Sequence, residues 1–260
     1  SFFKKIQKIF FWLKGNIKQT FSNYEIFQIF KNNKLILLYL IQNKILEIDQ
    51  SIFNEMIDQN DTFQYLEYFL PEVKSFLLSK KYTEIKDDIF MNENILISDD
   101  QTNPIYDEKR ERGENGHYIC HIIQNDFIDE FVSYVNQQCV PLSSTIKPSI
   151  FETNLFLLKQ TNTTLIEYAT FYGSIQIFNF LRMNGVEINR SLWSYAIHGR
   201  NPEIIHYLEK VTYLKTMKKE VLHESMKCYH HELTEYIINN YYNENEEINK
   251  DVKFLNFSYF

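Results

Sequence analysis

Glycine, proline and cysteine are scarce in this 260-residue sequence. Six Gly and five Pro exclude collagen-like and linker-dominated architectures and argue against a β-propeller. The three cysteines, Cys120, Cys139 and Cys228, are too few for a disulfide framework, which indicates a reducing, intracellular and therefore cytoplasmic location. The longest apolar run covers residues 35–41, far short of the roughly 20 residues that span a bilayer.

Basic residues are also in deficit, since the formal net charge is −7. Phosphate binding needs a surplus of Lys and Arg, so general nucleic-acid binding is not expected. The 18 Tyr and 22 Phe could stack on bases, but most fall at helical core spacing and lack a basic surface around them. Hydrophobic residues make up 44% of the chain, enough to bury a core.

Apolar residues recur at i, i+3, i+4 and i+7 in nearly every window, and period-2 alternation is rare, which predicts an all-α fold. Capping residues mark several helix starts: Asn201-Pro202-Glu203, Ser174, Asp126 and Asp61. The expected helix pairs are 24–31 with 34–43, 51–59 with 61–70, 118–124 with 126–136, 164–172 with 174–184, 191–199 with 201–210, and 221–229 with 231–241.

We expect five segments: an amphipathic basic capping helix (1–20), amino-terminal helix pairs (21–80), an irregular connection (81–115), a repeat block (116–242) and a tail (243–260). Proline, Asn, Asp and charge runs mark the connection, which contains one expected helix near 81–92. The start at Ser1 rather than Met predicts that the true amino terminus lies further upstream.

An internal repeat is the strongest signal in the sequence. Residues 164–169 (TLIEYA) align with 191–196 (SLWSYA) at an offset of 27 residues. The two alanines of the whole chain, Ala169 and Ala196, therefore share one register. A small side chain is needed where neighbouring helices approach closely, because a larger one would overpack by roughly 1–3 kcal/mol.

The stretch 164–173 (TLIEYATFYG) resembles the T-P-L-H-x-A-A-x-x-G signature of the ankyrin repeat, and 185–189 (GVEIN) resembles its closing G-A-D-V-N. Residues 147–154, followed by the repeats at 164–209, resemble a divergent protist ankyrin family described as a domain of unknown function. The repeat positions are Thr164, Ala169, Gly173, Gly185, Ser191, Ala196 and Pro202. The period of 27 residues is shorter than the usual 33 or so. The missing residues fall at 189–191, where the family builds its hairpin finger, so most of the finger is expected to be absent.

The resemblance implies an α-solenoid of stacked helix-turn-helix repeats with shortened fingers, which acts in protein–protein recognition as a scaffold or adaptor. By the ankyrin pattern, an unidentified protein partner would meet exposed first-helix residues. Carried over residue by residue, these are Tyr168, Phe171, Tyr172, Tyr195, His198 and Gly199.

Residues 1–20 allow three interpretations. An apolar stripe (Phe2, Phe3, Ile6, Phe10, Leu13, Ile17) runs beside a basic face (Lys4, Lys5, Lys8, Lys14, Lys18). A capping helix that closes the repeat stack is favoured over a membrane-surface helix and over a targeting segment. The membrane interpretation would make the chain a peripheral membrane adaptor.

Catalytic, cofactor and metal sites are not expected, nor is a small-molecule substrate. No glycine-rich phosphate loop or strained nucleophile turn is present in the sequence, and acidic pairs such as Asp87-Asp88 are typical of solvated loops. Two groups contain metal-ligand residue types, His117/Cys120/His121 and His223/Cys228/His230/His231, but neither has paired zinc-ligand spacing. An enzyme site in the irregular 71–115 region remains a third hypothesis.

Overall fold

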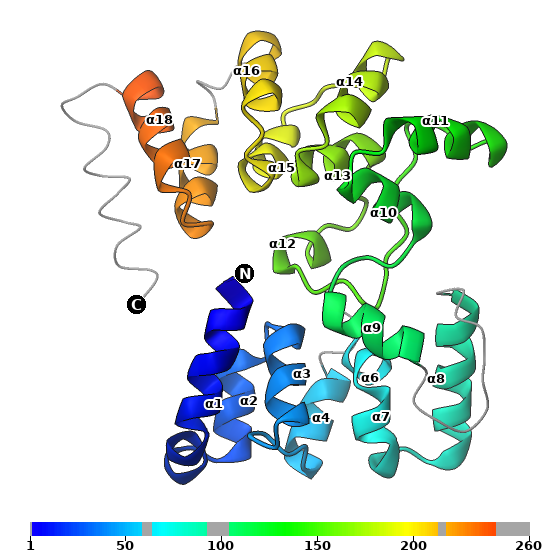
Figure 1. Cartoon of the computed structure of the whole chain (residues 1–260), viewed down its shortest axis with the longest axis vertical. Coiled ribbons are helices and arrows are strands. Elements are labelled where there is room, and N and C mark those ends of the chain that lie inside the picture. Colours follow the sequence, from blue (N-terminus) through cyan, green and yellow to red (C-terminus); the bar gives the residue numbers. More distant parts are fainter. Residues whose placement is uncertain (1, 59–63, 93–103, 213–216, 243–260) are drawn as a thin grey trace. The chain divides into compact units, whose positions relative to one another are not determined.

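The computed structural model describes residues 2–58, 64–92, 104–212 and 217–242, and most of these residues lie in helices (Figure 1). Within them the only extended pairing is an isolated antiparallel bridge between Thr145 and Thr164. The predicted all-α class is therefore confirmed. Among the described residues, no helix combines the length and the hydropathy of a transmembrane span. The start at Asp61 and the tail 243–260 lie outside the described residues.

The chain forms two compact units: residues 1–117 with 147–161, and residues 118–146 with 162–260. The helices of the first unit are α1 (Phe2–Thr20), α2 (Asn23–Phe30), α3 (Lys34–Gln42), α4 (Gln50–Asp58), α6 (Tyr65–Tyr68), α7 (Leu70–Val73), the 3₁₀ helix η1 (Lys74–Phe76), α8 (Ser79–Asn92), α9 (Pro104–Arg112) and α12 (Leu155–Leu158). The core of this unit is apolar and aromatic and centres on Phe27, Leu37 and Tyr65.

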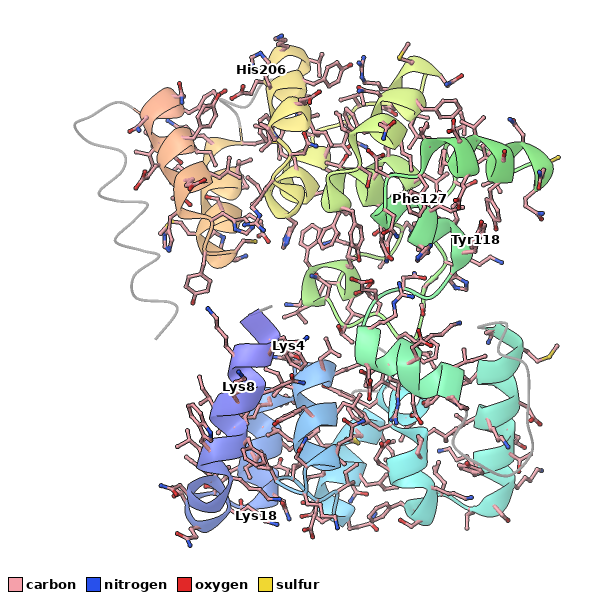
Figure 2. The ribbon with its side chains drawn as sticks, in the orientation of Figure 1. Lys4, Lys8, Lys18, Tyr118, Phe127 and His206 are labelled. Carbon is pink, nitrogen blue, oxygen red and sulfur yellow. The ribbon has the colours of Figure 1, made fainter. Side chains whose placement is uncertain are left out.

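Helix α1 packs against α2 and α3. Phe10 meets the ring of Phe30 edge-on at 5.3 Å, and Tyr39 Oη donates to the carbonyl of Gln7 at 2.8 Å. Leu13, which was expected on the packed stripe, is instead exposed. Figure 2 shows Lys4, Lys8 and Lys18 extending from this helix.

The segment expected as an irregular connection contains α9, which the sequence analysis missed. The helix has no apolar stripe that would predict it, because its sequence is a charge run and its buried residues are Tyr106 and Arg110. The Arg110 guanidinium pairs with Glu72 at 2.8 Å and with Asp107 at 2.7 Å, and it lies over the Tyr106 ring. These partners offset the desolvation of the charge.

Residues 147–161 pack in the first unit, although the sequence analysis had placed them in the 116–242 block. The buried Lys34 ammonium donates to the carbonyls of Ile150 and Glu152, each at 3.0 Å. Glu152 Oε1 accepts from the amides of Thr153 and Asn154, whereas Oε2 is buried with no hydrogen-bond partner among the described residues. Burial raises the pKa of Glu152 to about 7, against the opposing charge of Lys34.

The second unit contains four successive helix pairs, which Figure 1 shows in chain order from green to orange. Their bounds are α10 (Tyr118–Gln124) with α11 (Ile128–Gln137), α13 (Leu165–Tyr172) with α14 (Ile175–Met183), α15 (Leu192–Gly199) with α16 (Pro202–Val211), and α17 (Lys218–Lys227) with α18 (His231–Tyr241). The first helices pack in the order α10, α13, α15, α17, and the second helices in the order α11, α14, α16. The unit is thus a row of pairs in two layers.

Each of the four pairs turns through a residue with positive φ: Asp126 (52°), Gly173 (69°), Arg200 (51°) and Tyr229 (54°). This shared left-handed residue ends the first helix and reverses the chain. Two of the turns are also tied to their neighbours. The Asp126 carboxylate accepts from the amides of Gln176 and Ile177 at the start of α14, and Asn201 Nδ2 donates to the Gly173 carbonyl.

The two alanines lie where the sequence repeat predicts, since Ala169 and Ala196 are both buried and α13 packs along α15. The two backbones approach closely at Gly199, where a Cβ atom would lie 2.1 Å from the Thr170 carbonyl oxygen and 3.0 Å from the Gly173 nitrogen. At the other end of the two helices, Ser191 Oγ donates to Glu167 at 2.5 Å.

Thr164 and Ser191 share a repeat register but begin their helices differently. Thr164 forms a capping box with Glu167. Ser191 makes no side-chain cap, because its hydroxyl is engaged by Asn189 and Glu167 and the residue three positions later is Ser194 rather than an acid. Asn201, Pro202 and Gly185 occupy the cap, first-turn and left-handed positions predicted for them.

We predict that Gly199→Ala destabilises the protein by about 3 kcal/mol or more, because the added methyl would clash with backbone atoms that have no rotamer to change. Urea unfolding followed by circular dichroism measures the change. Gly15→Ala in α1 is the control, since nothing lies within 4 Å of the added atom. Equal stability of Gly199→Ala and the wild type would contradict the close packing of α13 on α15.

We also predict a pH-dependent stability from Glu152. Its folded pKa lies above the value of 4.5 expected for an unperturbed Glu, so the folded chain binds more protons between about pH 4.5 and 7. The free energy of unfolding should therefore fall by up to about 3 kcal/mol as the pH rises from about 4.5 to above 7. Glu152→Gln should remove that fall.

The measurement is urea unfolding of both proteins at pH 5 and pH 8. Glu108→Gln, a change at an exposed acid of α9, is the matched control and should keep the wild-type pH dependence. The assignment to Glu152 fails if Glu152→Gln and the wild type lose equal stability between the two pH values.

Candidate binding surface on the first helices

The first helices α10, α13, α15 and α17, hereafter the first-helix row, are linked by a chain of polar and aromatic side chains. Gln124 Nε2 of α10 donates to the Tyr168 hydroxyl at 2.9 Å and to that of Tyr172 at 3.4 Å. The rings of Tyr168, Tyr172 and Phe171 follow at centroid distances of 4.8 and 5.0 Å. Phe171 then stacks on the His198 imidazole of α15 at 5.1 Å. The row thus brings together four of the six residues predicted to bind a partner.

The six residues predicted to bind a partner differ in their exposure to solvent. Tyr168, Phe171 and Tyr195 are buried, so the prediction that they are exposed is wrong. Tyr168 and Phe171 lie on α13, which has a neighbouring helix on each side, and Tyr195 lies with its hydroxyl 3.5 Å from that of Thr163. Burial also raises the pKa of the Tyr195 hydroxyl.

Tyr172, His198 and Gly199 remain partly exposed. Gly199 has a structural role that the ankyrin comparison did not supply, because its missing side chain permits the contact with Thr170 and Gly173. Tyr172 and His198 are therefore the two predicted residues with side chains that can meet a partner without unpacking the helices.

The row ends in a cluster of three ligand-type side chains. His198 Nε2 lies 3.1 Å from Glu224 Oε1, and Cys228 Sγ lies 3.6 and 3.7 Å from the two ring nitrogens of His198. The three ligand atoms are all within 4.8 Å of one another, and each residue is partly buried. Glu224 and Cys228 stand four residues apart at the end of α17, so they share one face of that helix.

The surroundings of this cluster shift the pKa values of Glu224 and Cys228 in opposite directions. The hydrogen bond from His198 is the main reason that the pKa of Glu224 is lowered. Burial and the Glu224 charge raise the pKa of the Cys228 thiol to about 11, although Lys227 and Arg200 act against them. Without a bound cation the cluster therefore holds a carboxylate beside a neutral thiol.

As a metal ligand, Cys228 was grouped by the sequence analysis only with the histidines nearest to it in sequence, and the contact with His198, thirty residues earlier, was missed. The i, i+4 spacing of Glu224 and Cys228 was the one available signal. Residues of the other group have separate contacts: His117 lies 3.4 Å from the Pro148 carbonyl, Cys120 is buried, and His121 meets the Phe127 ring.

A groove of about 510 Å³ adjoins this end of the row, between the turn that contains Arg200 and the start of α18. Tyr229, His230 and Tyr236 line it, and Tyr229 is 78% exposed. Aromatic and basic side chains at a groove are typical of protein-binding surfaces.

Comparison with models of protein families, with curated proteins and with solved structures gives no match to this chain.

Proposed function

We propose that this chain is a divergent ankyrin-type repeat protein that binds a partner protein through the first-helix row and performs no chemistry of its own. The observation that carries the proposal is the ordered contact of α10, α13, α15 and α17, each paired with a second helix through a left-handed turn. Repeats of this kind expose an extended surface whose side chains vary from repeat to repeat, which suits recognition of proteins.

Details of the repeat support the ankyrin type. Thr164 caps its helix as the first residue of the T-P-L-H signature would, and Gly173 takes the left-handed conformation at the signature's glycine. The buried Ala169 and Ala196 match its small residue. The fingers are absent or short, because α15 begins only a few residues after Gly185.

The proposed contact surface consists of Tyr172 and His198 on the row and Arg200 and Tyr229 at the adjoining turns. All four are at least partly exposed, and Arg200 and Tyr229 also line the groove. Tyrosine and arginine are the residue types that most often dominate binding energy at interfaces. A partner that covers both the row and the groove would bury these side chains together.

We predict that Tyr172→Ala combined with Tyr229→Asn weakens partner binding about thirtyfold or more, because a loss of about 1 kcal/mol at each of two buried interface tyrosines amounts to this factor. Asn is chosen at position 229 because it tolerates the positive φ found there. The partner is first captured from a native lysate with the wild-type chain, and its affinity for each variant is then measured by biolayer interferometry.

Tyr118→Ala is the matched control, since Tyr118, at the start of α10, is 57% exposed, contacts Glu130 and Tyr134 of α11, and is not one of the four residues of the proposed contact surface. It should keep the wild-type affinity. A partner that loses affinity for Tyr118→Ala and not for the double variant binds elsewhere, and the proposed surface is then wrong.

A second function, attachment to a membrane surface, is favoured by the outer face of α1. Phe11 is 65% and Trp12 76% exposed, although the same helix packs Phe10 and Ile17 against the first unit. Lys4, Lys5 and Lys8 are exposed on the preceding turns. Exposed aromatic side chains beside lysines suit the interface of an anionic bilayer.

We predict that the chain co-sediments with vesicles containing phosphatidylserine more than with neutral phosphatidylcholine vesicles, because the lysines add electrostatic attraction. Phe11→Ser with Trp12→Ser should weaken this binding roughly tenfold. Leu78→Ser, at another highly exposed apolar residue of the first unit, is the control. Equal sedimentation of the double variant and the wild type would contradict membrane attachment through Phe11 and Trp12.

The hypothesis of an enzyme site in residues 71–115 has less support. The buried polar side chains of α9 serve packing: Arg110 is engaged by Glu72 and Asp107, and the Tyr106 hydroxyl donates to the carbonyls of Glu67 and Tyr68. Residues 93–103 lie outside the described part of the chain.

A further inference from the structure

We propose that His198, Glu224 and Cys228 together bind a zinc ion that joins α15 to α17. The proposal goes beyond partner recognition and does not depend on it, because it concerns the link between two helix pairs of this chain. It starts from the geometry of the cluster, in which ligand atoms from two neighbouring first helices lie within 4.8 Å of one another.

The donor types select the metal. An imidazole nitrogen, a carboxylate oxygen and a thiol sulfur are the three ligand types that zinc sites in proteins use. Sulfur disfavours Mg²⁺ and Ca²⁺, which take oxygen ligands. Zinc is therefore the divalent ion that best fits this combination.

The spacing of the ligand atoms is close to that of a zinc site. Bond lengths of about 2.0–2.1 Å to nitrogen and oxygen and about 2.3 Å to sulfur place neighbouring ligand atoms of a tetrahedral site about 3.3–3.6 Å apart. His198 Nε2 lies 3.1 Å from Glu224 Oε1 and 3.6 Å from Cys228 Sγ. Cys228 Sγ is almost equally far from both ring nitrogens of His198, so rotation of the side chains is needed to turn the sulfur and Nε2 toward one ion. Water would take the fourth position.

The surrounding structure holds the ligands in place. The His198 ring is stacked on Phe171, and α15 is fixed against α13 one residue later at Gly199. Glu224 and Cys228 are carried by α17, a helix that is itself held in place by the buried Val221, Leu222 and Ser225. Both sides of the site thus belong to packed helices, which lowers the cost of assembling it.

The local charges become balanced when the ion binds. Glu224 contributes one negative charge and Cys228 a second after its thiol proton passes to solvent, so the pair neutralises Zn²⁺. Lys227 Nζ lies 3.4 Å from Glu224 Oε2, the oxygen that does not contact His198. Lys227 would then orient the carboxylate while Oε1 binds the metal.

The experiment uses the full chain without a histidine tag, stripped of metal by a chelator that is then removed. Titration with Co²⁺ should produce a sulfur-to-cobalt charge-transfer band and the visible bands of four-coordinate cobalt. Zn²⁺ should displace the cobalt with a stoichiometry of one ion per chain, and it should raise the melting temperature of the metal-free protein.

Cys228→Ser should abolish the charge-transfer band, and His198→Gln and Glu224→Gln should each weaken zinc binding more than tenfold. The matched controls are Cys139→Ser and His206→Gln, which change an exposed cysteine and an exposed histidine of the same unit and should bind zinc as the wild type does. Circular dichroism of each metal-free variant establishes that it is folded before binding is measured.

Three results would overturn the proposal. One is cobalt binding without a thiolate band, and another is wild-type zinc affinity in folded Cys228→Ser and His198→Gln. The third is a loss of zinc affinity in the controls equal to that in the cluster variants, which would show non-specific binding. Because none of these measurements uses the partner, failure of the metal site and failure of the proposed recognition surface can be told apart.

Discussion

The contact between the backbones of α13 and α15 is the constraint on which the second unit depends. Gly199 approaches the Thr170 carbonyl so closely that even a methyl group has no room. This contact fixes the spacing of the two central helix pairs, and the buried Ala169 and Ala196 lie on the same two helices. Side chains further along the row, from Gln124 to His198, can then form one continuous set of contacts.

Polar links at the helix ends complement this close packing. Asp126 caps the start of α14, Asn201 reaches back to the Gly173 carbonyl, and Ser191 bonds to Glu167. Each link joins one pair to the next and satisfies a backbone or side-chain group that packing would otherwise desolvate. The arrangement of the pairs is therefore specified by directional bonds as well as by apolar burial.

The sequence predicted the local features of this unit well, because they depend on nearby residues. The capped start at Asn201, the turn at Gly173 and the buried alanines follow from short-range patterns. The predicted caps at Ser174 and Asp126 were wrong, because Ser174 makes no side-chain cap and Asp126 binds the start of α14 instead of its own second helix. Exposure was harder to predict, since Tyr168 and Tyr195 are covered by segments distant in sequence. The His198–Cys228 contact and helix α9 were missed because one needs tertiary proximity and the other buries a charged Arg110.

Three of the four left-handed turns are made by Asp126, Arg200 and Tyr229 rather than glycine. A residue with a side chain is strained at positive φ, by roughly 1–2 kcal/mol. The same side chain restricts the unfolded backbone, so less conformational entropy is lost on folding than glycine would lose. A chain with only six glycines can therefore repeat this turn. In each turn, the smaller entropy loss on folding offsets part of the torsional strain in the folded state.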